Sequence, residues 1–163
     1  MQLPAMLRMC TAAFGALVLL TPLAAQDRPS TDQTRYDQET DPVRKARVLV
    51  KLGDEQIDEA RKQLKNGDEV ASLNTLERYR DEVRHVAELL KATGVDAEKR
   101  PAGFKDLQIS LRETVRRIDD LILTLPVDKR PFFREVRTDL VNTQNELIDA
   151  LFPRQPERNS KKP

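Results

Sequence analysis

The sequence has almost none of the residues from which metal centres and nucleophilic sites are built. Its 163 residues include one cysteine (Cys10), one histidine (His85) and no tryptophan. A single Cys and a single His cannot form a zinc site, a Cys–His catalytic pair or a disulfide within the chain. We therefore expect a protein that is not an enzyme and that holds neither a metal ion nor a cofactor.

Charged residues are abundant but balanced, with 28 Lys and Arg against 27 Asp and Glu. They make up 34% of the chain and apolar residues 39%, which is typical of globular or long-helical proteins rather than disordered ones. The only charge in the first 25 residues is Arg8, so the remainder carries 27 charges of each sign. A neutral protein has no overall field to attract nucleic acid or anionic lipid. We expect no nucleic-acid partner, and a membrane contact only through an uncleaved N-terminal segment.

Residues 1–25 have the parts of a secretory signal. Arg8 precedes an apolar run over about 9–20, and Pro22 and Ala24-Ala25 follow it. This run is shorter than the roughly 20 residues that span a bilayer as a helix. The pattern predicts a cleaved signal peptide over 1–25 and export, most simply to a bacterial periplasm; an uncleaved anchor is the alternative. Cys10 precedes most of the apolar run, which argues against lipidation.

Three segments follow the predicted cleavage site. Residues 26–40 are polar, with Tyr36 as the only large apolar side chain, and predict a flexible leader. Residues 41–152 carry apolar stripes with heptad spacing and predict a four-helix domain. Residues 153–163 are rich in proline and basic residues and predict a disordered tail.

Turn and cap residues divide the four-helix domain into two hairpins. The first hairpin, 41–93, starts at the helix-capping pair Asp41-Pro42 and reverses at Asn66-Gly67. The second, 104–152, reverses at Pro126 and ends before Pro153. No segment has the pattern of a strand. The sequence predicts an all-α protein, an antiparallel four-helix bundle built from two long helical hairpins after an N-terminal signal sequence.

A polar layer is expected halfway along the bundle. Gly53 occupies an apolar-stripe position and Tyr79 falls at the same height on the next helix, so the glycine leaves room for the tyrosine ring. A buried Tyr hydroxyl needs a hydrogen-bond partner, and Thr114, Thr143 or Gln144 can supply it. Such a layer either fixes the register of the helices or forms a small-ligand pocket.

The adjacent aromatic residues Phe132 and Phe133 are candidates for a partner contact. Successive helical residues diverge by about 100°, so the two rings cannot both point into the same core. We expect core or cap positions for both rings; the alternative is that one ring caps the bundle while the other is exposed to a partner. His85 lies off the apolar stripe and is expected on the surface.

The first helix carries its charges in blocks. Four carboxylates, on Asp54, Glu55, Asp58 and Glu59, are expected to face solvent rather than to bind a metal ion. A basic first turn opposes the helix dipole. We therefore expect carboxylates from a neighbouring segment beside Arg44 or Lys45.

Residues 41–90 resemble a bacterial family of secreted or envelope-associated helical hairpins, known only as a domain of unknown function. The resemblance rests on a set of positions at and after the start of the first hairpin: Asp41-Pro42-Val43-Arg44-Lys45-Ala46, Leu49, Leu52, Glu59-Ala60, Leu64 and Tyr79. Gly53 departs from the Ala expected there. The resemblance implies export and helical pairing, and no chemistry.

These patterns favour a non-catalytic periplasmic module that binds or scaffolds a protein partner of the cell envelope. Two alternatives remain open: a bundle that binds a small ligand or a metal ion, and a self-associating coiled coil in which a second copy of the chain is the partner. Apolar residues left off the main stripes are the candidates for self-association: Leu49, Leu52, Leu73, Leu89, Val141 and Ile148.

Overall fold

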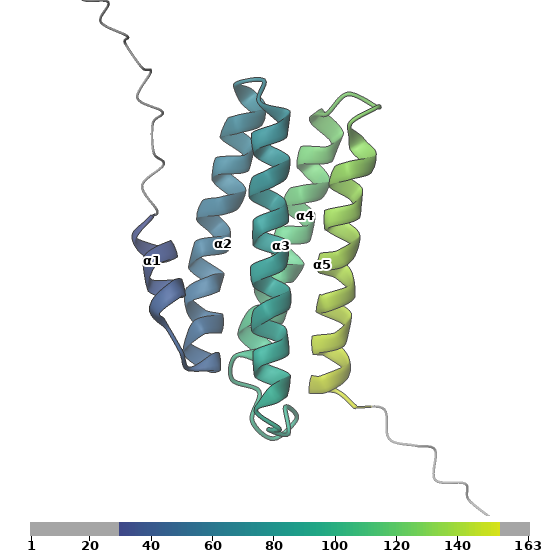
Figure 1. The fold of residues 1–163 in the computed structure, drawn as a ribbon. Helices are drawn as coiled ribbons and strands as arrows, with labels where there is room; N and C mark the ends of the chain where they lie inside the picture. The colour runs from purple at the N-terminus through teal and green to yellow at the C-terminus, as the bar shows by residue number, and fades with distance from the viewer. Residues whose placement is uncertain (1–29, 154–163) are drawn as a thin grey trace, which may run out of the picture.

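A computed structural model describes residues 30–153 of the chain. Within this range the fold is an all-helical bundle without strands (Figure 1). Its helices are α1 (Thr31–Gln38), α2 (Pro42–Lys65), α3 (Glu69–Ala92), α4 (Phe104–Thr124) and α5 (Arg130–Leu151). The predicted signal peptide and residues 154–163 of the predicted tail lie outside the described residues. None of the described helices combines the length and the hydropathy that a membrane span requires.

The four long helices pack side by side around one apolar core. α2 contacts α3 and α4, and α5 contacts the same two helices. The turn that joins α2 to α3 and the turn that joins α4 to α5 lie at the same end of the bundle (Figure 1). The core side chains come from all four long helices; those with essentially no exposed surface include Leu49, Leu76, Leu107, Leu111, Ile118, Leu140 and Leu147.

The long helices begin and end close to the positions that the cap residues indicate. The Asp41 carboxylate accepts a hydrogen bond from the amide of Arg44 at 2.8 Å, and Asp68 accepts one from Ala71 at 2.9 Å. Gly67, with φ +79°, adopts the left-handed conformation that ends α2 without the steric cost a side chain would add. The limits of α2 and the start of α3 therefore follow from residues next to them in the sequence.

Ion pairs between helices match the packing order. Arg117 on α4 reaches both Asp54 at 2.9 Å and Asp58 at 2.6 Å on α2. On the opposite side of the bundle, Arg84 on α3 pairs with Asp139 on α5 at 3.2 Å. Because each pair joins neighbouring helices, these charges favour the observed arrangement over one with the helices exchanged.

α1 is the main departure from the sequence prediction. The segment predicted as part of a flexible leader over 26–40 contains a helix over Thr31–Gln38, which packs on the first half of α2 (Figure 1). Tyr36 is 6% exposed and belongs to the core. One aromatic residue gives no periodic apolar pattern, so the sequence of this segment alone does not reveal the contact.

The same contact corrects part of the self-association prediction. Leu49 and Leu52, two of the candidates for a leftover apolar stripe, are 0% and 2% exposed. They share one face of α2 with Lys45 and Gln56, which both contact α1 side chains. The candidates on α3 and α5, namely Leu73, Leu89, Val141 and Ile148, are half-buried.

Candidate functional site

The predicted polar layer has a tightly packed centre at Gly53 and Tyr79. Both residues are buried, and Tyr79 has no exposed surface. A Cβ atom built on Gly53 would lie 2.6 Å from Cε2 of the Tyr79 ring, closer than such atoms approach in proteins. The Tyr79 ring therefore occupies the space that a side chain at position 53 would fill, as the sequence predicts.

The Tyr79 hydroxyl is paired inside the core. Its oxygen lies 3.3 Å from the Thr114 hydroxyl on α4. Burial raises the pKa of Tyr79 to about 12, although the Thr114 hydrogen bond opposes this shift. Thr143 does not join the pair, because its hydroxyl donates to the carbonyl of Asp139 in its own helix at 3.1 Å. The layer is thus narrower than predicted and joins α2, α3 and α4.

The Tyr79 ring fills the space beside Gly53 that a ligand would need. Three surface grooves of the described residues are lined by other side chains. The geometry matches the structural interpretation, in which a polar pair fixes how the helices align.

A second polar cluster, which sequence reasoning did not predict, connects α1 to the bundle. The Glu82 carboxylate on α3 accepts hydrogen bonds from Gln33 on α1 at 3.0 Å and from Gln56 on α2 at 2.9 Å. The Tyr36 hydroxyl donates to the backbone carbonyl of Glu82 at 3.4 Å. Glu82 therefore connects three helices. Burial, aided by the nearby charge of Glu82, raises the pKa of Tyr36.

Lys45 adds a cationic contact to this cluster. Its ammonium nitrogen lies 4.4 Å from the centre of the Tyr36 ring and donates to the carbonyl of Glu39 at 3.1 Å. Only 9% of Lys45 is exposed. The side-chain oxygen of Gln56 is buried and has no hydrogen-bond partner among the described residues. The cluster holds three helices together through hydrogen-bond donors, one carboxylate and a cation–π contact.

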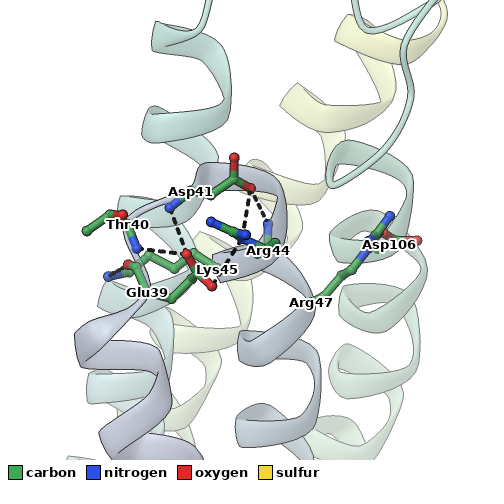
Figure 2. Close-up of polar contacts among 7 residues, drawn as sticks. All are labelled: Glu39, Thr40, Asp41, Arg44, Lys45, Arg47 and Asp106. Carbon is green, nitrogen blue, oxygen red and sulfur yellow. Dashed lines mark hydrogen bonds and ion pairs between the residues drawn. The ribbon is translucent and has the colours of Figure 1, made fainter.

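The turn between α1 and α2 supplies the carboxylates expected near the basic first turn of α2 (Figure 2). One oxygen of Glu39 accepts from the amides of Thr40 and Asp41, both at 2.9 Å, and the other lies 3.3 Å from Arg44. One turn further, Arg47 reaches Asp106 of α4 at 3.2 Å. These carboxylates offset the unfavourable position of positive charge at a helix N-terminus.

The surface positions singled out in the sequence do not converge on a reactive group. His85 is exposed and lines an open groove beside Tyr36, together with polar residues of α3. The four carboxylates of the first long helix are also exposed, and two of them are the partners of Arg117. Among the described residues, no group of three or more His, Cys, Asp or Glu has an arrangement that could hold a metal ion.

The aromatic pair divides as the helical geometry requires. Phe133 is 2% exposed and packs in the core, whereas Phe132 is 54% exposed. Phe132 has apolar neighbours at the same end of the bundle: Leu123 is 72% exposed, Val127 76% and Val70 71%. We call these four residues, Val70, Leu123, Val127 and Phe132, the hairpin-tip surface, because they lie in or beside the two turns at one end (Figure 1).

The hairpin-tip surface was only partly visible in the sequence. Leu123 lies off the apolar face of α4, and Val127 lies in the turn after Pro126, so the sequence shows both only as apolar residues outside the core pattern. A groove of about 330 Å³ also opens at this end, lined by Leu64, Leu121, Leu125 and Pro126 among others. Exposed apolar side chains that gather in one place mark interaction sites more often than isolated ones do.

Comparison with known proteins yields no relative that informs this site. No family model, no curated protein and no solved structure matches the chain.

Proposed function

We propose that the protein is an exported, non-catalytic binding or scaffolding module of the bacterial periplasm. In this proposal residues 1–25 act as a signal sequence, and α2 to α5 form an antiparallel four-helix bundle of two hairpins. The support for export is the charge and apolar pattern of the N-terminal segment. The support for the bundle is the packing of each long helix on two others.

The hairpin-tip surface is the observation that carries the binding proposal. Folding a bundle that lacks disulfides depends on burying apolar area, yet four large apolar side chains remain at least half exposed at one end. Phe132 sits directly beside the buried Phe133, so its backbone is held by the core while its ring faces outward. Rigid presentation of an aromatic side chain is a common property of binding sites.

The alternatives have less support. A small-ligand site at the polar layer would need space that the Tyr79 ring occupies. Two of the six candidates for a self-associating coiled coil, Leu49 and Leu52, are buried. The Tyr79 hydroxyl, the one titratable group in the layer, is shielded from substrates by complete burial.

Photo-cross-linking in the cells that produce the protein tests the proposal. A photoreactive amino acid would replace Phe132 in one variant and Ile109 in a control. Ile109 is 55% exposed on the side of α4, so the two probes have similar access to solvent. We expect envelope components to be captured by the Phe132 probe and not by the Ile109 probe. Equal capture by both probes, or capture of cytosolic proteins only, would contradict the proposal.

A further inference from the structure

The hairpin-tip surface combines exposed apolar side chains with local positive charge. The two segments that form this end, 61–73 and 120–134, contain six basic and four acidic residues. The other described residues contain 16 basic and 21 acidic residues. The tip is therefore positive and the body of the bundle negative, although the whole chain is nearly neutral.

Three lysines at the tip, Lys62, Lys65 and Lys129, are exposed. Lys62 also lies 3.5 Å from Glu59 of its own helix, a solvent-exposed pair of the kind that contributes little to stability. Two of the four acidic residues have local roles: Asp68 caps α3, and Asp128 lies 3.9 Å from Lys129. Long lysine side chains can also extend their ammonium groups past an apolar surface toward phosphate groups.

The size of this end limits what can bind there. A helix with its side chains is about 10 Å wide, so the end of four packed helices covers about 400 Å². A stable protein–protein interface buries about 800 Å² on each partner. A lipid surface needs no such area, because apolar side chains enter it individually and the positive charges meet its headgroups.

We propose that the hairpin-tip surface docks on the surface of an anionic phospholipid bilayer, with Leu123, Val127 and Phe132 entering the interface. The negative body is repelled by the same membrane, so the bundle stands on its tips with its long axis close to the membrane normal. This inference rests on the proposed function and names the envelope component that the binding module recognises.

Vesicle co-sedimentation tests the docking directly. The chain from Gln26 onward, which retains all described helices and lacks the apolar N-terminal run, is mixed with vesicles of equal parts phosphatidylglycerol and phosphatidylcholine. Vesicles of phosphatidylcholine alone are the lipid control. We expect binding to the anionic vesicles to be about tenfold stronger than to the neutral ones, because each lysine near an anionic surface contributes to the affinity. Binding should weaken at high salt, because salt screens this attraction.

Matched variants separate the apolar and the charged contributions. Leu123→Ser/Phe132→Ser and Lys65→Glu/Lys129→Glu change the tip, whereas Ile109→Ser and Lys51→Glu change exposed residues on the body. Both tip variants should lower the affinity by about tenfold or more and both body variants should leave it unchanged. Circular dichroism verifies that every variant is folded.

Three outcomes would overturn the inference: no binding to anionic vesicles, equal binding to both vesicle types, or tip variants that bind as the unmodified chain does. If the chain does not bind anionic vesicles while the Phe132 probe still captures an envelope protein, the tip recognises a protein and only this inference is wrong. If the chain does not bind the vesicles and the probe captures nothing, the proposed function is wrong as well.

Discussion

The ring of Tyr79 occupies the space that Gly53 leaves empty in α2, with its Cε2 atom where a side chain would begin. The contact joins α2 and α3 at mid-height, and the hydroxyl extends it to Thr114 on α4. Three helices are thus aligned by one buried side chain. This relationship accounts for a glycine in the middle of a helix, a position that costs about 1 kcal/mol relative to alanine.

Gly53→Ala should therefore destabilise the fold, even though alanine favours helix formation. Forcing a methyl group to 2.6 Å from the Tyr79 ring typically costs about 1–3 kcal/mol of unfolding free energy, more than the helix propensity gained. Urea denaturation followed by circular dichroism measures the change. Lys51→Ala, at an exposed position of the same helix, is the control and should stay within about 0.5 kcal/mol. A more stable Gly53→Ala variant would show that the ring can move aside.

High pH should weaken the fold through Tyr79. Its folded-state pKa of about 12 exceeds the ordinary value of 10, so the folded state holds the phenol proton more tightly than the unfolded state does. The raised pKa of Tyr79 contributes fully to the free energy of unfolding below pH 10. This contribution is lost as the pH rises toward 12, at up to about 1.4 kcal/mol per pH unit.

Urea denaturation of the unmodified chain and of Tyr79→Phe across this pH range isolates the effect. The variant should lose about 0.5–1.5 kcal/mol at neutral pH, because the Thr114 hydrogen bond is gone. Its stability should then fall less steeply above pH 10. Parallel curves for the two proteins would mean that the Tyr79 hydroxyl is not sealed from solvent.

The sequence predicted the long helices well because their information is local. The cap at Asp41, the turn at Gly67 and the heptad stripes lie within single segments, and the structure places the helix limits within a residue or two of the predictions. The Gly53–Tyr79 contact could also be predicted from the sequence. A glycine at an apolar-stripe position indicates that a large side chain packs there, and Tyr79 lies at the same height on the next helix.

The contacts that hold α1 on the bundle could not be predicted from the sequence in the same way. Gln33 and Tyr36 find their partner at Glu82, 49 and 46 residues further along the chain, and nothing in the polar segment 26–40 points to that position. Of the hairpin-tip surface, only Phe132 could be singled out from the sequence, for a related reason. Its members come from two turns far apart in the sequence, and only the bundle brings them to one end.

Removing the Tyr36 ring should release α1 without unfolding the bundle. Tyr36 is the only buried residue of this helix, and it provides both the Lys45 contact and the hydrogen bond to Glu82. In Tyr36→Ala, hydrogen exchange over residues 31–38 should accelerate by at least about tenfold, while the core of α3 stays protected.

Gln38→Ala is the control for this experiment, because Gln38 is an exposed residue of the same helix. Its hydrogen exchange should match that of the unmodified chain. Unchanged exchange in Tyr36→Ala would show that the Gln33–Glu82 contact alone holds α1 in place.

The two neighbouring arginines of α4 should differ in their effect on stability. Arg117 is 18% exposed and pairs with two carboxylates of α2, whereas Arg116 is 74% exposed and pairs only with Glu113 of its own helix at 3.8 Å. We expect Arg117→Ala to cost about 1 kcal/mol and Arg116→Ala less than about 0.5 kcal/mol. The difference should shrink in 1 M salt, where exposed charges are screened within about 3 Å. If the two substitutions lower the free energy of unfolding equally, the ion pairs between Arg117 and α2 do not stabilise the fold.

The most direct test of the account combines stability and binding in one variant. Leu123→Ser/Phe132→Ser changes two exposed side chains at the tip and none of the core. We predict that its unfolding free energy stays within about 0.5 kcal/mol of the unmodified chain, while its capture of envelope material falls to the background level. A variant that is equally stable and still captures that material would show that the hairpin-tip surface is not the binding site.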